Sequence, residues 1–94
     1  MPVMHFHLRW PDQSASRCYS PSLVVRDYLE PGQSYPLDDF LRRTREALGI
    51  ASERVREKYG FACSQALDQL SEIEAKASAF SSQPGAQVQV TAFD

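Results

Sequence analysis

Hydrophobic and polar side chains alternate over the first segment of the chain, from Val3 to Trp10. One face of this segment carries Met4, Phe6, Leu8 and Trp10, and the other carries Val3, His5, His7 and Arg9. A period of two predicts a β-strand with one buried face and one face in solvent. Residues 11–14 have the chemistry of a turn, and residues 15–20 are predicted to form the return strand of a hairpin.

The register of this hairpin depends on which residues form its tip. With residues 12–13 at the tip, His7 lies opposite Cys18 on the return strand. Cys18 and Ser20 are then expected beside the histidines, and Arg17 and Tyr19 are expected on the face that carries Phe6 and Leu8.

Residues 21–29 allow two interpretations. Ser20 followed by Pro21 is typical of an N-cap and a first helical residue, and residues 31–32 (Pro-Gly) are suited to stop a short helix after Leu29. The β-branched pair at residues 24–25 instead favours an extended edge segment, because such side chains lose rotamer freedom in a helix. Both interpretations stay open.

A long amphipathic helix is predicted from Leu37 to Tyr59, where hydrophobic residues recur at spacings of three and four. Acidic residues 38–39 begin this helix and Lys58 lies in its last turn, as the helix dipole favours, and Gly60 is placed to end it. Two ion pairs four residues apart are expected on its surface, Asp38–Arg42 and Asp39–Arg43.

A second helix and a last strand complete the predicted order. Ser64 is suited to cap the helix, whose hydrophobic stripe is Ala66, Leu67, Leu70, Ile73, Ala77 and Phe80. After a loop at residues 81–85, alternation returns with Val88, Val90 and Ala92 on one face. This order predicts an α+β fold: a small antiparallel sheet, made of the N-terminal hairpin and the C-terminal strand, covered on one face by two long helices. Phe6, Leu8, Phe40 and Leu70 are expected to meet in its interior.

Composition limits the classes of function. The 94 residues suffice for one hydrophobic core, so residues 1–94 are assigned to a single α+β domain, and 43% of them are hydrophobic. Ten basic against twelve acidic residues give a net charge of −2, which argues against nucleic acid and anionic membranes as partners. No apolar run approaches the roughly 18 residues that a membrane span needs, and the N-terminus does not resemble a secretory signal. Cytoplasmic location is therefore expected.

A metal site is the first chemical candidate. His5 and His7 project from the same side of a strand, and a facing Cys18 would supply a third ligand with the spacing that zinc accepts. Solvent-facing histidines that bind nothing are far more common than such a site. We therefore expect no metal and no cofactor, and keep these three residues as weak metal candidates.

The two cysteines are the second candidate. Cys63 precedes the second helix, near its positive end, and Cys18 lies near His7 in the expected register, and both features favour a reactive thiolate. Neither cysteine has the orienting third group of a catalytic triad, and cysteines near a core are usually packing residues. Both are expected to be reduced thiols.

The chain contains several unusual strings: RWPD at 9–12, CYSPSLVVRDYL at 18–29, SYPL at 34–37, IASERVR at 50–56 and KYGFACS at 58–64. These strings strongly resemble a family of small bacterial proteins that is named for a nitrogen-starvation response and encoded in gene clusters with a nitrilase. The resemblance implies a bacterial, cytoplasmic protein linked to nitrogen limitation or to nitrile and cyanide metabolism. It also implies a cluster that encodes a radical S-adenosylmethionine protein and an acyltransferase. It implies no molecular activity, ligand or functional residues.

Two functions of different class follow from these observations. The first is a non-catalytic accessory protein, a monomer or weak homodimer, that binds a protein encoded in the cluster or a small metabolite. Its binding surface is expected to centre on the second strand and the following turn, with Cys18, Ser20 and Tyr35 as candidates. The alternative is a small enzyme that depends on Cys18 or Cys63, or on a bound metal.

Overall fold

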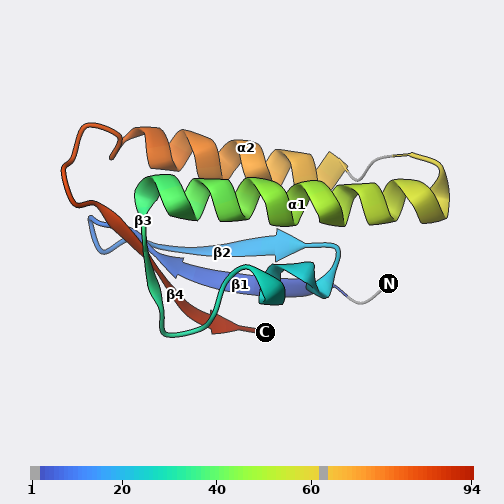
Figure 1. Ribbon diagram of the computed structural model, residues 1–94, viewed down its shortest axis with the longest axis horizontal. Coiled ribbons are helices and arrows are strands. Elements are labelled where there is room, and N and C mark those ends of the chain that lie inside the picture. The colour runs from blue at the N-terminus through green and yellow to red at the C-terminus, as the bar shows by residue number, and fades with distance from the viewer. Residues whose placement is uncertain (1–2, 62–63) are drawn as a thin grey trace.

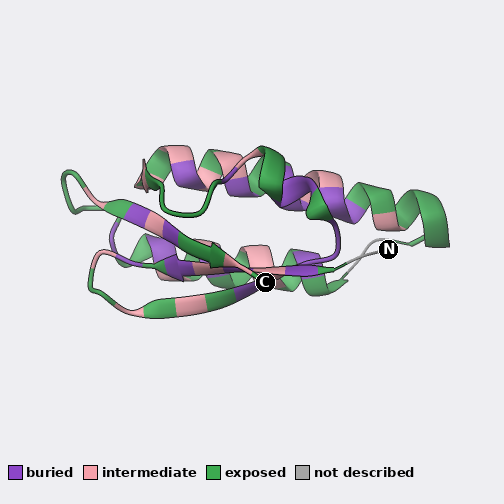
Figure 2. Ribbon diagram, turned by 90° about the horizontal axis from the view of Figure 1, so that it is seen from below, coloured by how far each residue is buried: buried purple, intermediate pink, exposed green. Residues whose placement is uncertain are grey.

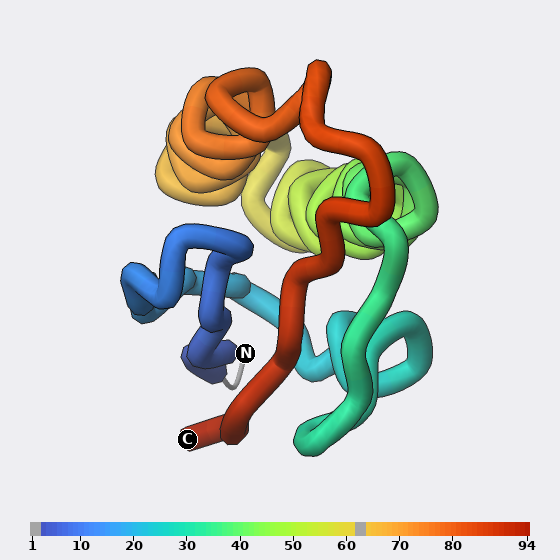
Figure 3. The backbone as a smooth tube through the Cα atoms, turned by 90° about the vertical axis from the view of Figure 1, so that its left-hand side faces the viewer, coloured from blue at the N-terminus to red at the C-terminus, as the bar shows by residue number. Residues whose placement is uncertain are grey.

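The computed structural model describes residues 3–61 and 64–94 and confirms the predicted α+β class (Figure 1). In chain order the elements are β1 (Met4–Arg9), β2 (Ala15–Ser20), the 3₁₀ helix η1 (Leu23–Asp27), β3 (Ser34–Pro36), α1 (Leu37–Tyr59), α2 (Ser64–Ser78) and β4 (Gln87–Phe93). The strands form one antiparallel sheet in the order β2-β1-β4-β3. Both long helices lie side by side over the same face of this sheet (Figure 3).

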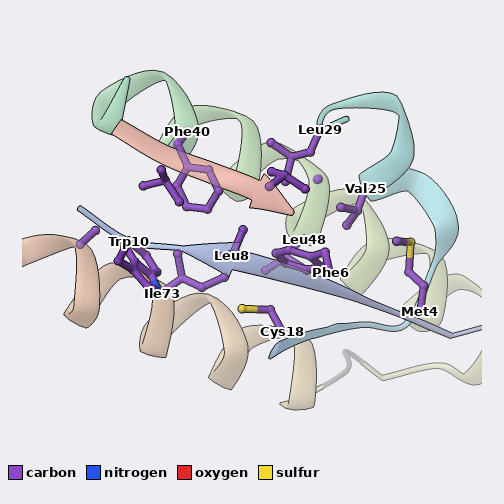
Figure 4. Packing of buried hydrophobic residues seen from close by; sticks show 14 of the residues in the cluster. Met4, Phe6, Leu8, Trp10, Cys18, Val25, Leu29, Phe40, Leu48 and Ile73 are labelled. Carbon is purple, nitrogen blue, oxygen red and sulfur yellow. The ribbon is translucent and has the colours of Figure 1, made fainter. Parts of the chain in front are cut away.

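The hydrophobic core lies between β1 and the two helices. Phe6, Leu8 and Phe40 are fully buried in it and Leu70 packs against its margin, so the predicted common interior is confirmed (Figure 4). Trp10 connects three parts of the chain. Its ring meets that of Phe40 edge to face with centroids 5.9 Å apart, and stacks on that of Phe80 at 6.1 Å.

The predicted register of the hairpin is wrong by one residue. Cys18 lies opposite Phe6 and Arg17 lies opposite His7. Cys18 and Ser20 therefore point into the core, whereas Arg17 and Tyr19 share the outer face with the histidines, opposite to their predicted face. The alternation of buried and less buried residues along the strands is visible in Figure 2.

The physical reason for the shift is a three-residue loop in place of a two-residue one. Trp10 N–H donates to Ser14 O at 2.8 Å, which leaves residues 11–13 as the loop. Gln13 adopts a left-handed conformation with φ 73°, as three-residue hairpin loops require at this position. The carboxylate of Asp12 accepts a hydrogen bond from Ser14 N–H at 2.9 Å and so holds the turn.

A second irregularity lies in β4. The register shifts between the partners of His7 and Leu8, so that Thr91 is an extra residue in the ladder. Val88 and Val90 are buried as predicted. Beyond this bulge, Ala92 pairs with His7 on the outer face, so its predicted place on the buried face is wrong.

The segment between the hairpin and α1 favours the helical interpretation of residues 21–29 over the extended one. It is helical, but as a 3₁₀ helix that begins at Leu23, and its N-cap is Ser22 rather than Ser20. Val24 and Val25 are buried within it. The short edge strand β3, which pairs with β4, was not predicted.

The two long helices match the predicted boundaries closely. α1 is continuous through Gly49 and ends at Gly60, which has φ 85° and donates its N–H to Arg56 O at 2.7 Å. The predicted Asp39–Arg43 pair is present at 2.8 Å. Four details differ from the prediction. Arg42 pairs with Asp39 at 2.6 Å rather than with Asp38, and α2 has Ser64 as its first residue. Leu67 is 48% exposed, and α2 ends at Ser78, so that Phe80 lies after the helix. In the described part of the chain, no helix is long and apolar enough to cross a membrane.

Alanine substitutions at two glycines, one within α1 and one directly after it, are expected to change the stability in opposite directions. An added Cβ at Gly49 meets no atom within 4 Å, so Gly49→Ala is expected to raise the free energy of unfolding by about 0.5–1 kcal/mol. Gly60→Ala forces a Cβ into the left-handed region and is expected to lower it by about 1 kcal/mol. Urea denaturation of both variants measures the difference. A loss of stability in Gly49→Ala would contradict a continuous helix at that position.

Candidate functional site

The face of the sheet opposite the helices carries a group of titratable side chains that lie close together. Figure 2 looks at the molecule from this side and shows α1 and α2 behind the strands. The outward-pointing side chains come from β1, β2 and the end of β4, because the corrected register and the bulge place them together. We call the following five residues the open-face cluster: His5, His7, Arg17, Tyr19 and Asp94.

Asp94 is the centre of the open-face cluster. One carboxylate oxygen, Oδ2, lies 3.1 Å from His7 Nε2. The other, Oδ1, lies 3.6 Å from Arg17 Nη2 and 3.8 Å from His5 Nδ1. The backbone fixes this position, since Asp94 and His5 exchange main-chain hydrogen bonds of 2.9 and 3.0 Å.

These neighbours keep the Asp94 carboxylate ionised. A hydrogen bond from His7 is the largest cause that lowers the pKa of Asp94, and the positive charge of Arg17 adds to it. Arg17 Nη2 also lies 3.3 Å from His5 Nδ1, and the His5 ring meets the Tyr19 ring edge to face at 5.9 Å. The cluster is thus a partly exposed network in which His5, His7 and Arg17 surround one carboxylate and Tyr19 packs against His5.

The predicted metal-ligand set does not come together. His5 and His7 share the open face as expected, but Cys18 points to the opposite face, because the hairpin has the other register. Arg17, a cation, lies beside both His5 and Asp94. Within residues 3–61 and 64–94, no group of three or more His, Cys, Asp or Glu side chains is arranged to hold a metal ion.

Cys18 is a buried packing residue. It is 1% exposed and lies among the core side chains in Figure 4. Burial raises the pKa of its thiol to about 12, and the negative charge of Glu72 acts in the same direction. Cys18 is a free thiol, as expected. Cys63 lies outside the described residues, so the corresponding predictions for it stay predictions.

The other two binding candidates lie far from each other in the sheet. Ser20 is fully buried at the end of β2, and its hydroxyl donates to Ser22 O at 2.7 Å. Tyr35 lies on β3, at the opposite edge of the sheet from β2. Its hydroxyl accepts a hydrogen bond from Glu30 N–H at 3.0 Å, and the Arg43 guanidinium lies 4.8 Å from its ring centre. A shared surface for Cys18, Ser20 and Tyr35 is not formed, and a binding role for each stays a prediction.

A small cavity of about 200 Å³ lies between β2 and α2. Its lining includes Trp10, Ser16, Gln69, Glu72 and Lys76. Gln69 Oε1 accepts a hydrogen bond from the main-chain N–H of Tyr19 at 2.9 Å. This side chain thus satisfies a donor of the edge strand β2 that a neighbouring strand would otherwise pair with. The indole N–H of Trp10 is already bonded to Ser16 Oγ at 2.9 Å. The polar groups of this groove therefore stabilise the edge of the sheet.

Comparison with known proteins places the chain in a family. The family model described as nitrogen starvation-induced protein NitG matches residues 5–93. The chain belongs to the NitG family. The match covers both long helices and all of the strands except Met4, the first residue of β1, and it ends one residue before Asp94. No curated protein and no solved structure matches the chain significantly.

The Cys18 thiol is expected to resist ionisation. In a Cys63→Ser variant, which keeps Cys18 as its single thiol, absorbance of the thiolate at about 240 nm should stay absent from about pH 7 to about pH 10. The same variant unfolded in urea should titrate near the ordinary value of about 8.5.

The raised pKa of Cys18 also makes the free energy of unfolding depend on pH. Because the folded state raises this pKa, the stabilisation is complete below about pH 8.5 and is lost as the pH rises toward 12, so the free energy of unfolding should fall in that range. A thiolate that forms in the folded variant below about pH 8 would contradict the account and favour a cysteine-dependent enzyme.

Proposed function

We propose that this NitG-family protein is an accessory binding protein of the nitrogen-starvation response. It acts by non-covalent binding to a protein encoded in the same nitrile-metabolism gene cluster, and the open face of its sheet is the binding surface. Family membership supports the link to nitrogen starvation. The connection with a nitrilase cluster follows from the sequence resemblance alone.

The observation that carries this proposal is the division of chemistry between the two faces of the sheet. On the helix side, the thiol of Cys18 and the hydroxyls of Ser20 and Thr44 are buried, and the two hydroxyls donate hydrogen bonds to main-chain carbonyls. On the open side, the imidazoles, the guanidinium and the carboxylate of the open-face cluster are within reach of solvent. Exposed polar and aromatic side chains on a rigid scaffold are suited to recognition.

A small metabolite of the same pathway is the other ligand that an accessory binding protein could hold on the open face. The alternative class of function is an enzyme that uses Cys63. Binding energy in interfaces concentrates in Tyr, Trp and Arg side chains, and the open-face cluster presents Tyr19 and Arg17 side by side with two histidines. The flat surface of a sheet also suits a protein partner better than a small molecule, which is usually held in a concave pocket.

Affinity capture from nitrogen-starved cells tests the proposal with two matched variants. The first, Tyr19→Ala with Arg17→Ala, alters the open face. The control, Arg26→Ala with Arg42→Ala, removes exposed arginines from η1 and α1. We expect the wild type and the control to recover one protein encoded in the cluster, and the open-face variant to recover about tenfold less of it.

The outcomes separate the possibilities. Equal recovery with all three proteins would exclude the open face as the binding surface. Recovery of no such partner, together with no pathway metabolite that raises the melting temperature, would overturn the proposed function. Circular dichroism of the open-face variant shows whether it is folded, and a second variant, Arg17→Gln alone, keeps the test valid if the first is unstable.

A further inference from the structure

The open face differs in charge from the rest of the molecule. The chain as a whole has a net charge of −2, with twelve acidic residues. On the outward side of the sheet, however, Asp94 carries the single acidic side chain among the described strand positions and their ends, against Arg9 and Arg17. The other outward positions in the paired strands are uncharged or histidine: His5, His7, Ala15, Tyr19, Ser34, Pro36, Gln87, Gln89 and Ala92.

The contacts of Asp94 show what kind of group the basic side chains of the open face bind. Three side chains from two strands converge on one carboxylate, with the shortest approach at 3.1 Å from His7 Nε2 to Asp94 Oδ2. Arg9, exposed on the same face, has no carboxylate partner among the ion pairs of the described residues. An arginine and two imidazoles are groups that bind carboxylates through charge-assisted hydrogen bonds.

We propose that the open face binds a carboxylate-rich segment of a partner protein, and that Asp94 occupies part of this site until the partner's carboxylates displace it from His7 and Arg17. The inference rests on the proposed function and adds to it the chemistry of the partner. The Asp94 carboxylate then competes with the partner's carboxylates for His7 and Arg17. A variant that lacks this carboxylate therefore binds the partner more tightly.

A segment with several carboxylates fits this face better than a single anion. The donors lie on β2 and β1, and Arg9 lies further along β1 than His7, beyond the bulge in its pairing with β4. Adjacent strands are about 4.8 Å apart and alternate residues on a strand are about 6.7 Å apart, so the donors from His5 to Arg9 spread over roughly 13 Å along β1. One phosphate or one carboxylate cannot contact them all, whereas an extended acidic segment can.

Binding of such a segment is coupled to protonation. His5 and His7 are the only histidines of the chain, and histidine is the side chain that ordinarily changes charge between pH 5 and 8. The charged or titratable groups that face them are Arg9 on their own strand, Arg17 and Tyr19 on β2, and Asp94 next to β4. Added carboxylates favour the protonated imidazoles, so binding takes up protons and strengthens as the pH falls.

The test is a titration of the isotope-labelled protein with a short peptide of alternating glutamate and glycine, followed by NMR of the amide signals at about 0.15 M salt. We expect signal shifts confined to β1, β2 and the end of β4. Affinity should rise by about threefold for each histidine, or about tenfold in total, between about pH 7.5 and about pH 5.5. His5→Gln with His7→Gln should remove this pH dependence.

The decisive variant is Asp94→Asn, which keeps the size of the side chain and the main-chain pairing with His5. It should bind the acidic peptide about threefold to fivefold more tightly at about pH 7.5, because a competing carboxylate is gone. A merely structural ion pair predicts no gain. Arg26→Gln, on η1, is the matched control and should leave the affinity unchanged, whereas Arg17→Gln should weaken it.

Three outcomes would overturn the inference. They are equal binding of a lysine-and-glycine peptide, equal or tighter binding of inorganic phosphate or an oligonucleotide, and unchanged or weaker binding by Asp94→Asn. If the acidic peptide fails but the captured partner still requires Arg17 and Tyr19, the inference falls and the proposed function stands. If capture fails as well, the proposed function falls with it.

Discussion

The packing of Trp10 and its neighbours against both helices is the interaction on which the rest of the structure depends. Trp10 belongs to the buried face of the hairpin, and its ring meets Phe40 of α1 and Phe80 just after α2. Truncation of a buried tryptophan of this kind to alanine typically costs about 3–5 kcal/mol, a large share of the stability of a small domain. Because side chains on a strand alternate, burial of this face commits His5 and His7 to the other one.

Periodicity in the sequence is sufficient to predict the elements that bury many residues. The alternation of β1 and the stripes of both helices predict the layers, and Gly60 marks the end of α1 because its conformation suits glycine. The hairpin register was predicted wrongly because it depends on a three-residue loop closed by Gln13, a residue that seldom adopts a positive φ. The strand β3 is three residues long and has too short a pattern to be recognised.

Periodicity predicts one part of the candidate site, and local irregularities of the strands decide the other part. The shared face of His5 and His7 follows from spacing alone, whereas the presence of Arg17 depends on the loop and that of Asp94 on the bulge in β4. Each irregularity displaces a strand by one residue and exchanges its faces. The first brings Arg17 to the histidines and takes Cys18 away, which replaces a metal-binding set with a set that holds a carboxylate. The proposed recognition of an acidic partner rests on these two local features.

In the observed register the sheet has one face in the core and one open face that carries the titratable side chains. Attenuation of side-chain NMR signals by a neutral gadolinium chelate measures solvent access residue by residue and therefore tests this division of the two faces. We expect strong attenuation at His5, His7 and Arg17 and protection at Phe6 and Cys18. Attenuation at Cys18 together with protection at Arg17 would restore the other register, and protection at both histidines would show that the open face is covered. Either result would contradict the account.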